Sequence, residues 1–368
     1  MEKTDGWRVA LLLNMKHNAV AEFDAPGDAL AEYDSEETAE AIADALRAGG
    51  HEVVVLEADT TLLDTIRRAR VDLCFNIAEG HRGDARESQV PALLEMLGIP
   101  YTGSKVLANA ISLDKALTKR VWRDSGLPTA PFQVLPRDDE PLDHRLGFPL
   151  FVKPLREGSG MGINASSIVH DEAALREQVR WVVNTYRQPA LVEAYLPGRE
   201  FTVGLIGNTL APGEPPLSPL YDERGFCVFP ILEIDVSTIA ESVGVYDSHI
   251  KSDLPLASGY YCPAPIDEVL TAEIKGLAVA AFEAIGALDF GRVDFRLGAD
   301  GRPYLLEINT LPGLNPTYSD IVMAAQAGGM LYVELVLEIL NLAASRYGLS
   351  TTRQWELPLV LVEGRRTW

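Results

Sequence analysis

Residues 291–309 read GRVDFRLGADGRPYLLEIN and predict a β-hairpin around which the rest of the chain is arranged. Two strand-like runs flank an Asp-Gly dipeptide, and Asp-Gly is typical of tight two-residue hairpin turns. With Asp300 and Gly301 at the centre of the turn, Ala299 faces Arg302 and the pairing continues outward from there. The two predicted strands are residues 292–297 and 303–309.

The register of this hairpin divides its side chains between a polar and an apolar face. Asp294 lies opposite Glu307, and Arg292 lies opposite Asn309. Because side chains alternate across a strand, these four residues share one face. The other face carries the apolar pairs Val293/Ile308, Phe295/Leu306 and Leu297/Tyr304.

The polar face predicts a metal site. Two carboxylates placed directly across a ladder repel each other, so they are stabilised by a cation between them. Asp294, Glu307 and the Asn309 carbonyl are hard oxygen ligands of the kind that Mg²⁺ prefers, usually together with phosphate oxygens. The alternative is a solvated sheet face on which Arg292 neutralises the two acids.

Composition limits the class of protein and its partners. A chain of 368 residues with 47% hydrophobic and 23% charged residues predicts two or three domains of an ordinary globular protein. The formal charge of −21 argues against nucleic acid or an anionic membrane as partner. The N-terminus lacks the layout of a signal peptide, and no apolar run reaches the length of a membrane helix. Three dispersed cysteines form no disulfide framework, so a reducing cytoplasm is expected.

Residues 1–110 alternate strand and helix patterns and predict a parallel βαβ sheet in an N-terminal domain. Loops that follow the strands of such a sheet form a crevice, and Glu79, His81 and Arg82 follow a buried strand. From the residues alone, a surface histidine is the simpler interpretation of His81. The predicted strands are 9–13, 52–57 and 71–76, and the predicted helices are 35–49 (capped by Ser35), 62–69 and 86–97.

Residues 111–199 predict a smaller second domain with a glycine-rich loop. A strand at 150–153 leads into EGSGMG (157–162), and a second strand near 165–169 follows. No helix N-terminus follows the loop, so its backbone N–H groups would fold over phosphates as a flap, and Lys153 would supply a cation. A plain flexible hairpin is the alternative. The other predicted elements are helices 114–125 and 171–186 and a strand at 190–195.

Residues 200–350 predict a third domain that contains the hairpin. The segment 207–260 is rich in Pro and Gly, is too long for a simple connection, and suggests a lid or substrate loop. Residues 351–368 form a tail without an assigned purpose, with a β-like stretch at 355–363. The remaining predictions are a strand at 200–206 and helices at 268–284, 320–327 and 331–345.

Several stretches together resemble the ATP-grasp carboxylate–amine ligases, and within them the D-alanine–D-alanine ligases. They occur in the order expected of that family and cover most of residues 70–345. The stretches are LLEMLGIPYTGS (93–104), SLDKALTK (112–119), FPLFVKPLREGSGMGI (148–163), LVEAYLPGREFTVGLIG (191–207), YYCPA (260–264), DFGRVDFRL (289–297) and YLLEINTLPGLNP (304–316).

This resemblance implies an α/β ATP-grasp fold with a Rossmann-like N-terminal domain, ATP and Mg²⁺ (or Mn²⁺) as cofactors, amino-acid-like substrates and a homodimer. It also implies a role for each matching residue. Lys115 and Lys153 would contact the nucleotide phosphates, under a loop made of Glu157, Gly158, Ser159, Gly160, Met161 and Gly162, with Ser159 near the transferred phosphoryl group. Glu193 and the backbone of Ala194, Tyr195 and Leu196 would bind the adenine edge, Glu200 would bind the ribose, and Leu306 would also contact the nucleotide. Asp294, Glu307 and Asn309 would hold two Mg²⁺ ions, and Arg292 with the Gly313 N–H would stabilise the oxyanion.

The chain departs from the family pattern where the amino-acid substrates would bind. The Gly-Gly-x-Ser-x-Glu turn after the first strand is missing, and Glu32, Glu36 or Glu37 are its candidate replacements. In HRGDARES (81–88) only His81 survives from the family's motif. The substrate-loop lysine is expected at Lys251, with His249 as a rival, and the substrate-facing serine at Ser319, one position from Tyr318.

The sequence therefore supports an ATP-dependent ligase that forms a dipeptide or a dipeptide-like amide through an acylphosphate. D-Alanyl-D-alanine is the default product, and a specialised peptide ligase of secondary metabolism is the nearest alternative. A silent nucleotide-binding module and an ATP-grasp kinase that stops at phosphoryl transfer remain as further hypotheses.

Overall fold

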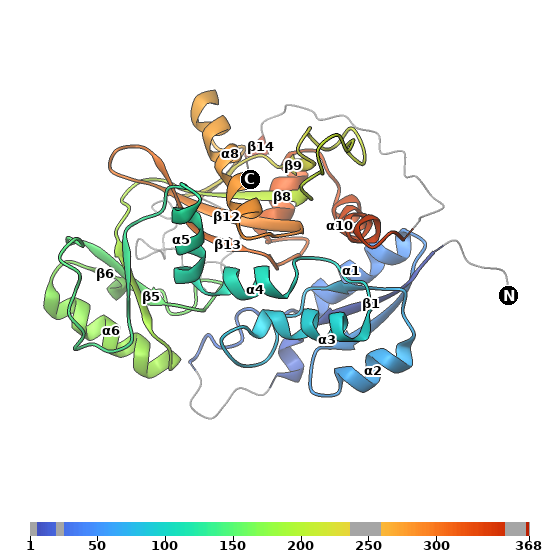
Figure 1. Cartoon of the computed structure of the whole chain (residues 1–368), viewed down its shortest axis with the longest axis horizontal. Coiled ribbons are helices and arrows are strands. Elements are labelled where there is room, and N and C mark those ends of the chain that lie inside the picture. The colour runs from blue at the N-terminus through green and yellow to red at the C-terminus, as the bar shows by residue number, and fades with distance from the viewer. Residues whose placement is uncertain (1–5, 20–25, 236–258, 350–365, 368) are drawn as a thin grey trace.

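The computed structural model describes residues 6–19, 26–235, 259–349 and 366–367. Its helices and strands are built around three β-sheets, as the α/β class predicts. Figure 1 shows the first sheet and its helices in blue at one end, the four-stranded sheet with α6 in green at the other, and the large sheet between and above them. Apart from β14 (Arg366–Thr367), which belongs to the predicted tail, the strands of each sheet fall within one predicted domain, and the domain boundaries stay a prediction.

The first sheet is parallel and carries helices on both faces. In its central strand, Val9, Leu11 and Leu13 pack toward α1 and α10, whereas Ala10 and Leu12 pack toward α2 and α3. Burial on both faces explains why this strand is a continuous apolar run. The order is β2-β1-β3, with β1 Arg8–Leu13, β2 Glu52–Glu57, β3 Leu73–Asn76, η1 Lys16–Asn18, α1 Glu36–Ala48, α2 Leu62–Ala69, η2 Arg86–Ser88 and α3 Gln89–Leu97.

The predicted βαβαβ order of this region is confirmed. Ser35 caps α1 as expected, because its Oγ accepts a hydrogen bond from the backbone N–H of Thr38 at 3.2 Å. The predicted helix 86–97 is divided instead into a 3₁₀ turn and α3.

The second sheet is antiparallel and packs on one long helix. Its order is β4-β7-β5-β6, and the apolar side of α6 covers it through Leu175, Val179 and Val182. The strand predicted at 165–169 is a 3₁₀ turn followed by only two strand residues. The elements are α4 Val106–Leu113, α5 Lys115–Asp124, β4 Phe132–Leu135, β5 Leu150–Pro154, η3 Ala165–Ser167, β6 Ile168–Val169, α6 Glu172–Tyr186 and β7 Ala190–Ala194.

The third sheet has seven strands and forms the largest core. It runs β13-β12-β8-β10-β11-β14, and β9 also pairs with β8. Helix α8 packs with Trp122 of α5 against one face, while α9 and α10 join the core that the first sheet shares. The bounds are β8 Glu200–Gly207, β9 Phe226–Val228, β10 Leu232–Ile234, β11 Tyr260–Cys262, α8 Glu268–Ala284, β12 Asp289–Leu297, β13 Pro303–Asn309, α9 Asp320–Ala327, α10 Tyr332–Arg346 and β14 Arg366–Thr367.

The segment predicted as one long lid loop, 207–260, is partly strand. β9 and β10 join the large sheet within it, so the interpretation of the whole segment as a loop is wrong. Residues 236–258 and the β-like tail predicted at 355–363 lie outside the described residues.

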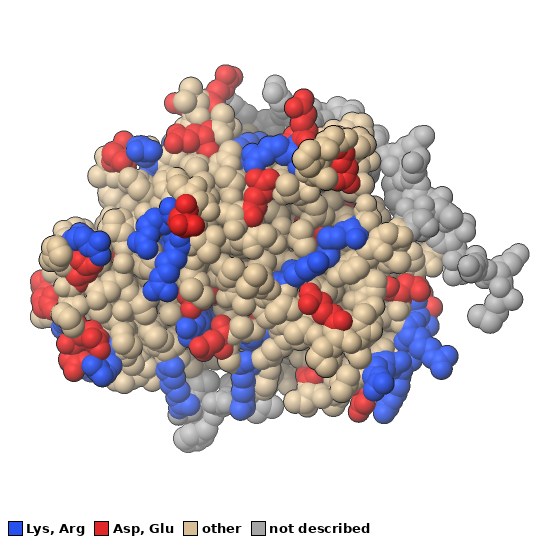
Figure 2. Space-filling view, viewed as in Figure 1, with Lys and Arg blue, Asp and Glu red and all other residues tan. Residues whose placement is uncertain are grey.

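The described part of the chain adds three further observations. Acidic and basic side chains are interspersed over the face in Figure 2, so the net charge does not gather there in one patch. In the described part of the chain no single helix could cross a membrane by length and composition, although the bent pair α9 and α10 passes that test together. All three cysteines are free thiols.

The β12–β13 hairpin pairs as predicted at one end and differently near its turn. Arg292 pairs with Asn309 and Asp294 with Glu307, as expected. The loop, however, contains three residues instead of two, since the backbone N–H of Gly298 donates to the Arg302 carbonyl at 2.9 Å. Gly301 has a φ of 75°, which suits the last position of such a loop.

A β-bulge corrects the one-residue offset that the longer loop creates. Phe295 pairs with Leu305, and Leu297 pairs with Pro303, so the predicted partners Leu306 and Tyr304 are wrong. The register shifts back between Asp294 and Phe295. The prediction missed both the longer loop and the bulge, and their effects on the register cancel beyond Asp294. For this reason the pairs on the polar face were predicted correctly.

Asp289 joins the first sheet region, the large sheet and α10 at the start of β12. The side chain is fully buried and accepts hydrogen bonds from the Gly103 N–H at 2.8 Å, the Asn208 Nδ2 at 2.9 Å and the Arg346 Nη2 at 2.7 Å. Its φ of 65° lies in the left-handed region, which Asp and Asn tolerate better than most residues.

Asp289→Ala should lower the free energy of unfolding by about 3–5 kcal/mol, because it leaves the Arg346 guanidinium without its buried partner. Urea denaturation followed by circular dichroism measures this. Asp124→Ala, at an exposed position of α5, should change stability by less than about 0.5 kcal/mol. Equal midpoints for the two variants would contradict the role assigned to Asp289.

Candidate active site

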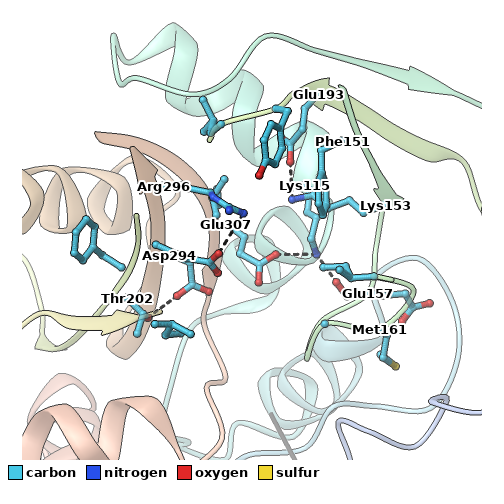
Figure 3. Close-up of a pocket in the computed structure, with 18 of the residues that line it drawn as sticks. Lys115, Phe151, Lys153, Glu157, Met161, Glu193, Thr202, Asp294, Arg296 and Glu307 are labelled. Atoms are coloured by element: carbon cyan, nitrogen blue, oxygen red, sulfur yellow. Dashed lines mark hydrogen bonds and ion pairs between the residues drawn. The ribbon is translucent and has the colours of Figure 1, made fainter. Parts of the chain in front are cut away.

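Two adjoining cavities lie along the polar face of the hairpin. The first cavity, of about 980 Å³, extends from the hairpin to the strands of the four-stranded sheet, and Figure 3 shows its side chains. The second cavity, of about 1100 Å³, extends toward the first sheet. Five residues line both: Lys115, Glu157, Arg292, Glu307 and Asp320.

The β-bulge determines which residues of β13 reach these cavities. Leu305 and Ile308 are buried in the core of the large sheet, whereas the consecutive residues Leu306 and Glu307 both line the first cavity. Without the extra residue, strict alternation would turn one of them inward. The bulge thus presents an apolar and an acidic side chain side by side.

The two opposed acids of the hairpin are neutralised by different cations. Asp294 receives the Arg292 Nε and Nη2 at 2.9 and 2.8 Å and the Thr202 Oγ1 at 2.5 Å. Glu307 Oε2 lies 3.3 Å from the Lys115 Nζ. The sequence left open the alternative that Arg292 neutralises the two acids, and the structure contains that ion pair for Asp294.

The donor set of this face fits Mg²⁺ bound together with phosphate. Two carboxylates stand opposite each other, and Asn309 directs its Nδ2 to Asp294 at 3.3 Å, which leaves its side-chain oxygen for another partner. Within the described residues, no group of three or more His, Cys, Asp and Glu is arranged to hold a metal alone. A magnesium ion that keeps only one or two carboxylates and takes substrate phosphates needs no such group. The predicted roles of Asp294, Glu307 and Asn309 stay predictions.

A buried carboxylate joins two lysines at the wall of the first cavity. Glu193 is 3% exposed, and its Oε1 lies 2.7 Å from the Lys153 Nζ and its Oε2 2.8 Å from the Lys119 Nζ. Burial by itself would raise the pKa of Glu193, but the two ammonium groups outweigh it and lower the pKa to about 2. The Glu193 side chain therefore holds Lys153 in position.

The predicted adenine and ribose residues line the far end of the first cavity. Ala194, Tyr195, Leu196 and Leu306 all face it, as predicted for residues beside a base. Glu200 lines it too, and burial raises its pKa to about 7 although Arg296 lies 3.5 Å away and opposes that shift.

The glycine-rich loop runs along the boundary of the two cavities. Ser159, Gly160 and Gly162 have positive φ values of 48°, 69° and 73°. Gly158 and Ser159 line the second cavity, whereas Gly160 and Met161 line the first. Lys115 donates a hydrogen bond from Nζ to the Glu157 carbonyl and so attaches the loop to α5.

The second cavity brings together several residues predicted for the substrate side. Gly313, Ser319, Asn309 and Glu32 line it, and the Ser319 Oγ accepts a hydrogen bond from the Asn315 N–H at 2.8 Å. Acids that the sequence did not single out also line it, namely Asp34, Glu87 and Asp320. Burial raises the pKa of Asp34 to about 8 and that of Glu87 to about 7.

Some predicted residues are not brought to this site. His81 is exposed and lines a third cavity with Arg82, which shares Glu32 and Glu157 with the second cavity but does not include Arg292. Glu36 and Glu37 are exposed at the start of α1. Lys251 and His249 lie outside the described residues.

Several site residues were missed from the sequence, and two of them had a readable signal. Lys119 follows Lys115 by four positions and therefore shares its face of α5. Arg296 follows Asp294 by two positions and shares its strand face. Phe151, Thr202 and Asp320 carried no such signal, because their approach depends on packing between distant segments.

Comparisons with known proteins agree on one family. Residues 121–218 and 220–341 match the family model described as D-ala D-ala ligase C-terminus. Among curated proteins, the chain is 37% identical to the uncharacterized protein y4sG of Sinorhizobium fredii, over 84% of this chain and 88% of that protein. It is 34% identical to a D-alanine–D-alanine ligase of Nitrosococcus oceani, over 83% of this chain and 88% of that one.

A solved structure supports the fold. The D-alanine–D-alanine ligase of Bacillus anthracis complexed with ATP superposes with a TM-score of 0.68 at 22% identity, over 93% of this chain and 99% of that one. The predicted ATP-grasp fold is confirmed.

Glu193→Gln should lower the free energy of unfolding by about 3–5 kcal/mol at neutral pH, because it leaves two buried lysines without their counter-charge. The pKa of this carboxyl is lowered from 4.5 to about 2 by folding, so its contribution is present above pH 4.5 and is lost as the pH falls toward 2. Urea denaturation at neutral and acidic pH measures both effects. Glu177→Gln, on the exposed side of α6, is the control, and equal losses in the two variants would contradict this role.

Proposed function

The chain belongs to the D-alanine–D-alanine ligase family. From that premise, we propose that it joins the carboxylate of one amino-acid-like substrate to the amine of another, and that this reaction takes place at the two cavities. It is an ATP-dependent, ADP-forming carbon–nitrogen ligase. The observation that carries the site assignment is the position of Arg292, Asp294 and Glu307, which lie on one hairpin face where the first cavity meets the second. The first cavity would take ATP, and the second would take the amino acids.

In the first step, a substrate carboxylate oxygen attacks the γ-phosphorus of ATP, the bond to the β-phosphate oxygen breaks, and ADP leaves. Lys115 and Lys153 would neutralise charge on the phosphoryl oxygens, and Ser159 lies where the two cavities meet. Mg²⁺ held by Asp294, Glu307 and Asn309 would supply further neutralisation when bound.

In the second step, the amine attacks the acyl carbon of the acylphosphate and phosphate leaves. The tetrahedral intermediate carries an oxyanion, which Arg292 and the Gly313 N–H would stabilise. Arg292 is oriented for this by Asp294 on one side and by Asp320 Oδ2 at 3.2 Å on the other. Its guanidinium still has N–H donors that these contacts do not use.

We expect the amino-acid side of the site to take substrates that carry an ammonium group, whose charge would stabilise the ionised form of acids that burial otherwise keeps protonated. The acids Asp34, Glu79 and Glu87 line the second cavity, where the family's Gly-Gly-x-Ser-x-Glu turn is missing. This difference supports a specialised peptide ligase as a second candidate beside D-alanyl-D-alanine synthesis. The three domains, the homodimer and the cytoplasmic location remain part of the proposal.

Release of ADP and phosphate on addition of D-alanine tests the default product, with a panel of L- and D-amino acids measured in parallel. We expect amino-acid-dependent release and a new dipeptide mass. Release with other amino acids but none with D-alanine would exclude D-alanyl-D-alanine. Nucleotide binding without turnover for any amine and carboxylate pair would overturn the ligase assignment.

Arg292→Ala should lower amide formation by on the order of 10²–10³, because an oxyanion donor is lost. Arg292→Lys keeps the charge that Asp294 and Asp320 require and serves as the better-folded variant. Arg302→Ala, at an exposed position of the hairpin loop, should leave the rate unchanged. If Arg292→Ala leaves ADP formation nearly unaffected and no amide is detected in the wild type, the chain is a kinase that stops at phosphoryl transfer.

A further inference from the structure

A buried ionic cluster connects the glycine-rich loop to two distant segments of the N-terminal region. Arg86 directs its Nη2 to Glu32 Oε2 at 2.7 Å and to Glu157 Oε2 at 3.2 Å, and its Nη1 to the Arg156 carbonyl at 2.9 Å. The side chains of Arg86 and Glu32 are 13% and 8% exposed. One guanidinium therefore joins the segment before α1, the 3₁₀ turn before α3 and the start of the loop.

Two carboxylates of the segment before α1 bind the backbone of the loop itself. Glu32 Oε1 accepts a hydrogen bond from the Gly158 N–H at 2.7 Å, and Asp28 Oδ2 accepts one from the Gly162 N–H at 3.0 Å. Asp28 is held in turn by the Tyr186 hydroxyl at 2.8 Å. Hydrogen bonds to ionised acceptors are stronger than those between neutral groups.

Two of the three loop N–H groups between these contacts have no acceptor among the described residues, so they can bind another ligand. In the described part of the chain, the N–H groups of Ser159 and Gly160 make no hydrogen bond, while that of Met161 donates to the Gly158 carbonyl at 2.9 Å. Ser159 and Gly160 line the two cavities at the boundary where the transferred phosphoryl group would lie. The protein thus binds the two ends of the loop and leaves its tip open.

We infer that Asp28, Glu32 and Arg86 form a clasp that positions the glycine-rich loop over the phosphates of ATP. The inference rests on the proposed nucleotide role of that loop. The clasp holds the loop closed before ATP binds, which reduces the entropy that binding would otherwise lose. A closed loop also keeps water away from the acylphosphate. Arg86 compensates the negative charge that Glu32 and Glu157 would otherwise bring close to the phosphates.

The space around Gly158 supports this assignment. A Cβ at residue 158 would lie 2.4 Å from Glu32 Oε1, so only glycine allows the carboxylate to approach the loop backbone. Asp28 and Arg86 have no assigned part in the chemistry described above, and Glu32 lines the second cavity but binds the loop backbone. They act through the loop and are positioning residues.

Steady-state kinetics and the coupling of ATP use to amide formation test the clasp. In Glu32→Ala and Arg86→Ala, the KM for ATP should rise by about 10- to 100-fold, as expected for loss of a charge-assisted hydrogen bond. The ratio of ADP formed to amide formed should rise above that of the wild type, because water reaches the acylphosphate. Arg86→Lys should restore part of the coupling. Arg137→Ala, whose side chain pairs with Asp139 and Glu140 on the surface, is the control and should match the wild type.

These readouts separate a positioning role from a structural one. A merely structural role would reduce the amount of folded enzyme without changing either the KM or the ratio. If Arg86→Ala fails to fold, Asp28→Ala and Glu32→Ala carry the test. An unchanged KM for ATP and an unchanged ratio of ADP to amide in folded variants would overturn the inference. A lower KM for ATP in Glu32→Ala would also overturn it, because that result would mean that the carboxylates compete with phosphate. If the wild type forms no amide, the proposed function fails. The clasp can then still be tested by calorimetric titration of ADP with Mg²⁺ into the same variants, which measures their affinity for the nucleotide.

Discussion

The repulsion between Asp294 and Glu307 is the constraint on which the rest of the site depends. Two carboxylates opposed across a ladder need nearby positive charge, and Arg292 and Lys115 supply it from different elements. Lys115 belongs to α5, so its approach to Glu307 links this helix to the hairpin. The same side chain binds the Glu157 carbonyl and thereby carries the link on to the glycine-rich loop. An electrostatic requirement of one strand pair thus organises three elements around a single point.

Cations paired with counter-ions gather where this acidic protein would bind ATP. The chain has a net charge of −21, yet Lys115, Lys153, Arg292 and Arg296 all line the first cavity, with Lys119 just behind its wall. Burying cations costs solvation energy unless they are paired. Glu193 forms ion pairs with two buried lysines, and Asp294 and Asp320 form ion pairs with Arg292, so these contacts offset the lost solvation. The counter-ions therefore keep the cations in place at the cavity that we propose for ATP.

The clasp extends the same principle to the loop. Its carboxylates bind backbone N–H groups at the ends of the loop, and its arginine balances their charge. Closure would then depend on the N-terminal region as well as on the nucleotide. This arrangement connects the segment that lines the second cavity to the glycine-rich loop, since Glu32 lines that cavity and accepts a hydrogen bond from the Gly158 N–H.

Local patterns in the sequence determined the order of strands and helices in the first sheet, the N-cap of α1, and the polar face of the hairpin. Those features depend on side-chain periodicity and turn residues within a few positions, which a sequence displays directly. The tertiary structure alone decided the three-residue loop, the bulge that presents Leu306 beside Glu307, the burial of Lys119, and the roles of Asp28, Glu32 and Arg86. The loop and the bulge form within one hairpin but depend on how it packs in the large sheet, and the burial of Lys119 and the clasp depend on contacts between segments far apart in the chain, such as residues 28, 86 and 158. Packing energy selects such contacts only when the whole chain is folded, and no local pattern records them.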